Sequence, residues 1–317
     1  VDYDGTASSL LVEPERTNLI PYSEDFTTGS WSSFSVGTTP TLTSGFTAPD
    51  GSSNAYKISN PNKDSLWGYD GVADTNYART IYARTVSGTG TISLLSKNGN
   101  ADNVFSLTES WQRFEVNTAA LVPNIFYAVD FRVSGNLTEL LIWGGQSEVG
   151  SYPTSYIPTS GSTVTRVQDQ YSKTGISNLI GQTEGTVFVD VDFDTLSGLN
   201  MFLSIRPDAS NKIEIYRDSN IIYGEIASSS SFSFSKTGVT VGRYKIAVAY
   251  SSGSNVMYIN GDLISSNSTP FTFTSTLNSL YVGSRGGTSF IEQSRYNDIK
   301  LYKTRLSNSE LVTLTTI

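Results

Sequence analysis

Two aromatic residues, Trp67 and Tyr69, stand two positions apart in a polar stretch punctuated by glycine. On a strand this spacing places both rings on one face, because successive side chains alternate between the two faces. Asp70 follows directly and would add a carboxylate that accepts hydrogen bonds from hydroxyl groups. Rings that stack on a pyranose, with polar neighbours for its hydroxyls, are typical of sugar-binding sites. We therefore predict a carbohydrate-binding site at Trp67, Tyr69 and Asp70; the alternative is that both rings are buried between two sheets.

A second group of aromatic and cationic residues stands in the C-terminal half, at Tyr216, Arg217, Tyr223 and Arg285. Tyr216 alternates in step with Glu214, so it lies on the face opposite the isoleucines of the same expected strand. Arg285 precedes two glycines, in a loop with room for a ligand. We predict that this group, Tyr216, Arg217, Tyr223 and Arg285, binds carbohydrate. The alternative is that they are scattered surface residues that need no functional explanation.

Three aspartates, Asp190, Asp192 and Asp194, alternate with apolar residues along the clearest expected strand. Such a row suggests a calcium site or a catalytic site, but calcium takes about six to eight oxygens that converge from a loop. A strand spreads its side chains along a line, so the pattern favours a solvated outer face that also discourages pairing at a sheet edge. A structural calcium ion stays open, and no other cofactor is predicted.

The chain contains no cysteine and no histidine. Disulfides, thiolate nucleophiles and zinc sites of the usual Cys/His kind are therefore excluded, as is any mechanism with an imidazole base. Hydrolysis of a glycan would need paired Asp or Glu residues, and a lyase would need Tyr or Lys as its base. No stretch resembles a known catalytic signature. The sequence therefore predicts no catalytic residue and favours a binding protein, although it does not exclude an enzyme.

The net charge of −8 argues against nucleic acid or an anionic membrane as the main partner. No apolar run approaches the roughly 18 residues that a membrane-spanning helix needs, so membrane insertion is not predicted. The chain starts at Val1 rather than at a methionine. We therefore expect it to be part of a longer protein.

Short apolar segments separated by turn residues indicate β-structure along the whole chain. Asn260 and Gly261 form the strongest turn signal, that of a two-residue hairpin. Ser307 and Glu310 have the spacing of a capping box and predict the one short helix, at the C-terminal end. At 317 residues, the chain is predicted to be all-β, with two β-sandwich (jelly-roll) domains in tandem at residues 1–165 and 166–317.

The crossing between the two domains is expected within residues 140–169. An apolar strand is predicted to break at Gly144 and Gly145, because glycine adopts backbone shapes that other residues avoid. Pro153 and Pro158 then hold the residues before them extended and remove donors from any ladder. These features predict a stiff tie across the surface of the first domain, followed by a connection rich in serine, glycine and threonine.

Three segments, in this order, resemble parts of tailed-bacteriophage tail and fibre proteins. They are LLVEPERTNLIPYSEDF at residues 10–26, WGGQSEVGSYPTSYIPTSGSTVTR at residues 143–166, and YNDIKLYKTRLSNSELVTLT at residues 296–315. The resemblance implies a carbohydrate-binding-module-like (galactose-binding-like) jelly roll at residues 1–165. It implies a laminin-G/concanavalin-A-like lectin sandwich at residues 166–317. All three segments look like framework, so the resemblance is specific for architecture and weak for the ligand.

The same resemblance implies a non-enzymatic carbohydrate-binding or host-receptor-binding module of a phage tail or fibre. Its implied partners are a bacterial surface or extracellular polysaccharide, other phage tail proteins and further copies of the chain in a homo-oligomer. Its implied location is the virion or the extracellular space. Two alternatives stay open: a polysaccharide-degrading enzyme (depolymerase, lyase or glycosidase) and a purely structural fibre domain.

Overall fold

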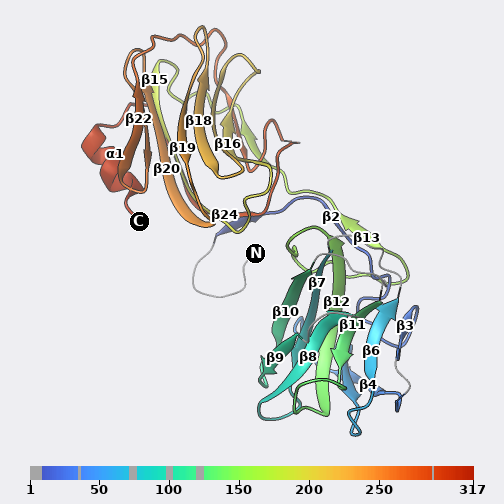
Figure 1. The fold of residues 1–317 in the computed structure, drawn as a ribbon. Coiled ribbons are helices and arrows are strands. Elements are labelled where there is room, and N and C mark those ends of the chain that lie inside the picture. The colour runs from blue at the N-terminus through green and yellow to red at the C-terminus, as the bar shows by residue number, and fades with distance from the viewer. Residues whose placement is uncertain (1–8, 35–36, 71–76, 98–102, 119–124, 288) are drawn as a thin grey trace. The chain divides into compact units, whose positions relative to one another are not determined.

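The computed structural model describes residues 9–34, 37–70, 77–97, 103–118, 125–287 and 289–317. The chain divides into two compact units, here called the first domain (Glu15–Val167) and the second domain (Gln168–Ile317 together with Val1–Pro14). Each domain is built from antiparallel sheets packed face to face (Figure 1). The predicted all-β sandwich fold is therefore confirmed.

The first domain has two five-stranded sheets and one small two-stranded sheet. One large sheet has the strands β10 (Gln112–Thr118), β7 (Tyr77–Arg84), β12 (Glu139–Val149), β5 (Ala55–Ser59) and β4 (Thr41–Phe46), in that order. The other has β3 (Trp31–Ser32), β6 (Leu66–Asp70), β11 (Ile125–Asp130), β8 (Gly90–Lys97) and β9 (Val104–Leu107). The small sheet pairs β2 (Arg16–Asn18) with β13 (Val164–Arg166).

Apolar side chains from both large sheets fill the space between them in the first domain. Ile81 and Ile142 from one sheet and Leu94 from the other are fully buried there. Trp143 faces the opposite side of its sheet, where the ring of Tyr156 covers it at 4.7 Å between ring centroids. Side chains along β12 thus alternate between two apolar clusters. One cluster lies between the sheets, and the other lies beneath the chain that follows the strand.

The chain after Trp143 takes a different course from the one predicted. β12 does not break at Gly144 but continues through a bulge, visible as a shift in register against β7 between Trp143 and Gln146. Gly144 has a φ of +64°, which glycine adopts without steric cost, so the strand bends and goes on. The predicted tie follows, and Glu148 anchors it by accepting hydrogen bonds from the backbone N–H and the hydroxyl of Thr154 at 2.8 and 2.5 Å.

The second domain has two six-stranded sheets and a helix. One sheet has the order β1 (Leu10–Val12), β24 (Ser294–Tyr302), β15 (Glu184–Phe193), β20 (Gly242–Ser251), β21 (Asn255–Ile259) and β22 (Asp262–Asn267). The other has the order β14 (Tyr171–Thr174), β23 (Ser279–Val282), β16 (Leu199–Ile205), β17 (Lys212–Asp218), β18 (Ile221–Ala227) and β19 (Phe232–Thr237).

The strand β1 belongs to the second domain, whereas the expected boundary placed it in the first. Leu10 pairs with Tyr296 and Val12 with Ser294 along the edge of β24. Val12 is fully buried, and a Cβ atom on Gly283 would come within 2.6 Å of its side chain. The chain therefore contributes an edge strand to the second domain before it forms the first domain.

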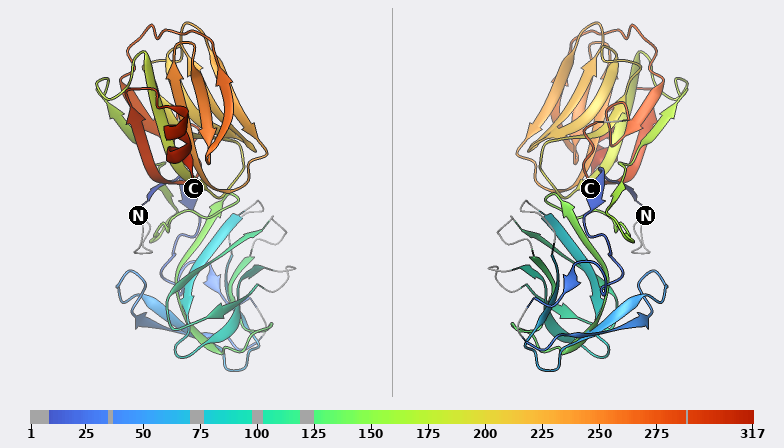
Figure 2. Two further views of the ribbon diagram at one scale, coloured as in Figure 1. Left: turned by 90° about the vertical axis from the view of Figure 1, so that its left-hand side faces the viewer. Right: turned by 90° about the vertical axis from the view of Figure 1, so that its right-hand side faces the viewer.

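Two local predictions in the second domain are confirmed. Asn260 and Gly261 have φ values of +51° and +89° between β21 and β22, as a hairpin turn of the primed type requires. The helix α1 (Asn308–Thr315) begins after Ser307, which forms the reciprocal capping box with Glu310. α1 lies against the outer face of the sheet that contains β20 and β21, where Leu311 is buried (Figure 2). Within the described ranges, no helix has the length and apolar character of a membrane span.

Candidate functional site

The predicted aromatic pair of the first domain lies in its core. Trp67 is 9% exposed and Tyr69 is 6% exposed, and both pack between the two sheets. The indole N–H of Trp67 donates to the carbonyl oxygen of Phe26 at 3.2 Å, and the Tyr69 ring meets Trp31 edge-on at 5.3 Å between centroids. The prediction of a sugar platform at Trp67 and Tyr69 is therefore wrong, because β6 turns their face toward the opposite sheet. Asp70 ends β6, and its side chain lies outside the described part of the chain.

The predicted residues of the second domain, by contrast, come together. Tyr216 on β17 and Tyr223 on β18 are direct cross-strand neighbours, and their rings stack at 5.0 Å between centroids with an interplanar angle of 19°. The guanidinium carbon of Arg285, from the loop after β23, lies 5.7 Å from the centroid of the Tyr216 ring. All three side chains are half-buried. We call Tyr216, Tyr223 and Arg285 the Tyr–Arg face.

The alternation of β17 places Arg217 on the other side of the sheet from the Tyr–Arg face. Arg217 is fully buried, and its guanidinium donates to the carbonyl oxygens of Gly198 and Ser219 at 3.2 and 2.7 Å. Its carbon lies 5.3 Å from the centroid of the Phe193 ring in the core. Arg217 is therefore a structural residue, and its predicted place beside Tyr216 in a binding site is wrong.

A buried carboxylate holds the cationic side chains at this face. Glu214 is fully buried, and its Oε2 receives the guanidinium of Arg285 at 3.0 Å and the ammonium of Lys212 at 2.9 Å. Its Oε1 accepts from the Ser204 hydroxyl at 2.9 Å and lies 3.7 Å from Arg206. A buried charge is tolerated only where it is paired and hydrogen-bonded. Glu214 therefore fixes Arg285 at the edge of the tyrosine pair.

The hydroxyl of Tyr216 stays protonated at neutral pH. Burial raises its pKa to about 12, and the negative charge of Glu225 acts in the same direction, against the opposing effect of Arg285. A protonated phenol can both donate a hydrogen bond and accept one, which suits a ligand rich in hydroxyl groups. It is a poor general base, because a base works best with a pKa near the operating pH. The site therefore favours binding over a lyase reaction with Tyr216 as base.

Phe290 extends this site and was not predicted from the sequence. The residue is 41% exposed and has a φ of +63°, a left-handed conformation that is uncommon for a bulky side chain. Its ring centroid lies 4.9 Å from the guanidinium carbon of Arg285, so Arg285 contacts two aromatic rings. Such strained residues concentrate at functional sites. No local signal in the sequence indicates a positive φ at phenylalanine, which explains why it was missed.

The aspartate row of β15 was predicted to be a solvated outer face that discourages pairing at a sheet edge; Asp194 is exposed and Asp192 half-buried, but the strand is not at an edge and Asp190 is buried. β15 lies in the middle of its sheet, between β24 and β20. Asp190 is only 3% exposed, and Arg243 donates to its two carboxylate oxygens at 2.8 and 2.7 Å. Among the residues that the structure describes, no group of three or more His, Cys, Asp or Glu side chains could hold a metal ion. The structural calcium ion therefore stays a prediction without a described site.

Comparison with known proteins identifies no family, because no family model and no curated protein matches the chain. Several solved structures resemble part of it. A carbohydrate-binding module (CBM40) of a Ruminococcus gnavus IT-sialidase, bound to α2,3-sialyllactose, is 14% identical over 47% of this chain and 97% of that chain, with a TM-score of 0.40. A leech intramolecular trans-sialidase is 17% identical over 47% of this chain and 26% of that chain, with a TM-score of 0.41.

A botulinum neurotoxin serotype D binding domain is 13% identical over 42% of this chain and 36% of that chain, with a TM-score of 0.36. Identities and TM-scores of this size carry no argument about a ligand or a role.

Proposed function

We propose that this chain is a non-enzymatic carbohydrate-binding module of a phage tail or fibre protein that recognises a bacterial surface or extracellular polysaccharide. The observation that carries the proposal is the row formed by Arg285, Tyr216 and Tyr223 on the outer face of β17 and β18. Aromatic rings supply the stacking surface for a pyranose, and fixed polar groups beside them bind its hydroxyls.

The free end of this row is the ring of Tyr223. One side of the ring faces Tyr216, and the cross-strand neighbour on the other side is Ser235 of β19, which is small and exposed. Because Ser235 is small, we propose that a sugar ring stacks on this side of the Tyr223 ring. Glu225, two residues further on the same face, would accept hydrogen bonds from its hydroxyls.

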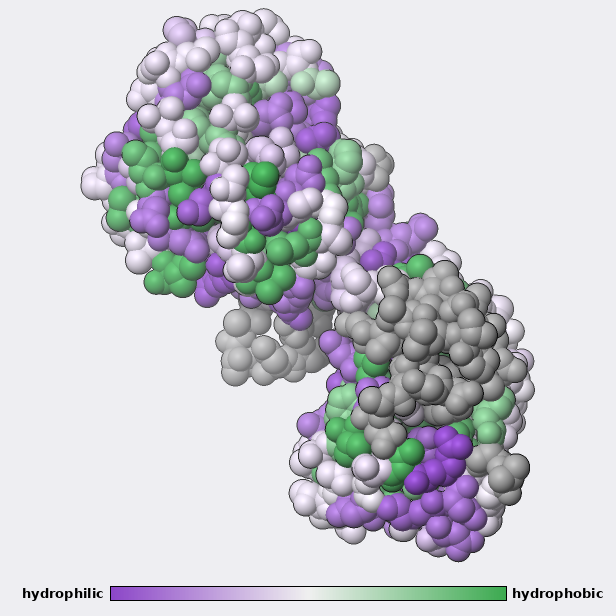
Figure 3. Space-filling view, viewed as in Figure 1, coloured by the Kyte–Doolittle hydropathy of each residue, from purple (hydrophilic) through white to green (hydrophobic). Residues whose placement is uncertain are grey.

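The face of the chain seen in Figure 3 suits a polar ligand of this kind. On the face seen in Figure 3, hydrophobic residues form small areas separated by hydrophilic ones rather than one extended apolar patch. The three framework segments that resemble tail and fibre proteins support the phage origin. On the basis of that origin we also propose tail proteins as partners, a homo-oligomer, and a location in the virion or outside the cell.

A glycan array of bacterial capsular and cell-surface polysaccharides tests the proposal, run on the full chain with a parallel assay for reducing and unsaturated ends. We expect saturable binding to at least one polysaccharide and no release of ends. Release that scales with the amount of protein would identify a depolymerase, lyase or glycosidase instead. A chain that binds none of the polysaccharides would leave the structural fibre domain as the function.

A further inference from the structure

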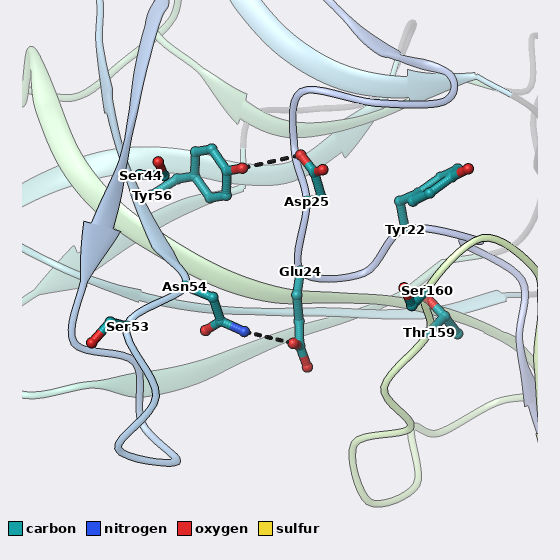
Figure 4. Close-up of a pocket in the computed structure, with 9 residues that line it drawn as sticks. All are labelled: Tyr22, Glu24, Asp25, Ser44, Ser53, Asn54, Tyr56, Thr159 and Ser160. Carbon is teal, nitrogen blue, oxygen red and sulfur yellow. Dashed lines mark hydrogen bonds between the residues drawn. The ribbon is translucent and has the colours of Figure 1, made fainter.

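A cleft of about 390 Å³ opens on the first domain, and neither Trp67 nor Tyr69 lines it. Four segments form it: the stretch before β3, the strand β4, the start of β5 with the loop before it, and the tie after β12, which lies about a hundred residues further along the chain (Figure 4). Its volume is typical of pockets for small ligands. The lining residues are Tyr22, Glu24, Asp25, Ser44, Ser53, Asn54, Tyr56, Thr159 and Ser160.

Two carboxylates are held in place in this cleft. Glu24 accepts hydrogen bonds from the Asn54 amide at 2.7 Å and from the Tyr156 hydroxyl at 3.1 Å. Asp25 accepts from the Tyr56 hydroxyl at 3.0 Å and from the backbone N–H and hydroxyl of Thr27 at 3.0 and 2.6 Å. Burial raises the pKa of Asp25, but these hydrogen bonds outweigh it and hold the pKa below the usual range. Each carboxylate keeps further acceptor capacity, since an ionised carboxylate has about four lone-pair positions.

Two tyrosine rings, those of Tyr22 and Tyr56, form the apolar part of the cleft (Figure 4). Trp31 donates to the carbonyl oxygen of Tyr22 at 2.8 Å. A Cβ atom on Gly29 would come within 2.8 Å of the Tyr22 ring, so only glycine lets the ring pack there. The Tyr56 ring meets Phe26 edge-on at 5.8 Å between centroids. Both rings are therefore fixed before any ligand arrives, which lowers the entropic cost of binding.

The charge of the cleft selects among ligands that contain hydroxyl groups. Its nine lining residues include two acids and neither lysine nor arginine. Its two carboxylates supply at most four of the roughly six to eight oxygens that calcium takes. Acceptors that are ionised attract hydroxyl and ammonium donors and repel uronates and phosphates.

We propose that this cleft is a second carbohydrate site, specific for neutral or amino sugars. It is independent of the Tyr–Arg face, where three cations surround Glu214. Fixed acceptors at Glu24 and Asp25 would bind the hydroxyl or ammonium groups of a sugar whose ring lies against Tyr22 or Tyr56. The chain would then hold one glycan-binding site in each domain, and the two sites would differ in their preference for charge.

Titration of the isotope-labelled full chain with galactose, glucosamine and glucuronate, followed by amide chemical shifts, tests this proposal. We expect galactose or glucosamine, but not glucuronate, to shift the amides of Asn54, Tyr56 and Ser160 in a saturable way. Ser53→Tyr should abolish these shifts by filling the cleft. Ser87→Tyr, at an exposed serine of the same domain outside the cleft, should leave them unchanged.

A second variant, which removes one negative charge from the cleft, tests the proposal even if Ser53→Tyr disturbs the fold. Glu24→Gln keeps the shape and should weaken binding of glucosamine about tenfold, the loss of one hydrogen bond to a charged group. The proposal is overturned if no sugar shifts these amides, if glucuronate binds as well as the others, or if calcium chloride alone produces the shifts. Tyr223→Ala should leave the titration unchanged, so failure at the Tyr–Arg face and failure at the cleft are distinguishable.

Discussion

The aromatic pairs Trp67/Tyr69 and Tyr216/Tyr223 were both predicted from the sequence to bind carbohydrate, and the structure places them in different surroundings. Both lie on strands among polar residues, but the first pair packs in the core and the second lies on an outer face. Alternation assigns residues to one face or the other, and it does not say which face is inward. On β17, Ile213 and Ile215 mark the inward face. On β6, Leu66, Gly68 and Asp70 alternate with the aromatic pair, and they do not form an apolar row that would mark a face.

The largest expected effect is a difference in the loss of unfolding free energy between a substitution in the first aromatic pair and one in the second. Trp67→Ala removes a buried indole, so we expect the first domain to lose about 3–5 kcal/mol of unfolding free energy. Tyr223→Ala, on a half-buried ring, should cost less than about 1 kcal/mol. Urea denaturation of both variants, followed by fluorescence, checks the contrast. Equal losses would contradict the assignment of one pair to the core and the other to the surface.

A second prediction concerns the support beneath the Tyr–Arg face. Glu214→Gln leaves Arg285 and Lys212 without their buried counter-charge, and we expect a loss of about 2–4 kcal/mol in stability, somewhat less than for complete removal of a buried partner. Glycan binding should weaken as well, because Arg285 is no longer fixed. Calorimetric melting and the array together check both effects. The comparison variant Glu225→Gln removes a half-buried carboxylate and should cost less stability.

Binding itself gives the third prediction. Tyr223→Ala removes the open end of the ring row and should weaken glycan binding by about 1–3 kcal/mol, the range known for stacking of a planar ligand on an aromatic side chain. Tyr171→Ala, at an exposed tyrosine on the edge strand β14, is the matched control and should bind as the unaltered chain does. Isothermal titration with the best polysaccharide from the array measures both. An unchanged affinity in Tyr223→Ala would remove the Tyr–Arg face from the binding site.

The smallest expected effect comes from the ion pair between Asp190 on β15 and Arg243 on β20. These strands belong to the sheet of the second domain that does not contain the Tyr–Arg face. Burial raises the pKa of Asp190, but hydrogen bonds from Arg243 and Asn297 outweigh it and lower the pKa below 3.8. A lowered pKa stabilises the fold above pH 3.8 and stops doing so as the pH falls through the folded-state value. Because Arg243 is 46% exposed, Asp190→Asn should cost only about 1 kcal/mol at neutral pH. Urea titrations from neutral pH to about pH 3 should show this difference shrinking; a constant difference would contradict the pairing.

Much of the candidate site of the second domain could be predicted, and that of the first could not. Tyr216, Tyr223 and Arg285 were found because isoleucines mark the inward face of the strand and a glycine-rich loop exposes the arginine. Glu214 was visible only as an alternating residue, because two of its three cationic partners, Arg206 and Arg285, come from other elements. The cleft at Glu24 and Asp25 was not predicted from the sequence. These two residues stand in the segment 10–26, which resembles framework, and the other residues that line the cleft come from separate segments.

The sequence by itself determined the all-β class, the Asn260–Gly261 hairpin, the capping box of α1 and the absence of imidazole and thiol chemistry. These features depend on residue type, on backbone preferences and on periodicity over a few residues. Only the tertiary structure decided that β1 pairs with β24 and that Trp67 faces the opposite sheet. Only it brought Tyr22, Asn54 and Ser160 to one cleft. The reason is that pairing and burial depend on the summed fit of distant strands, which no short stretch of sequence contains.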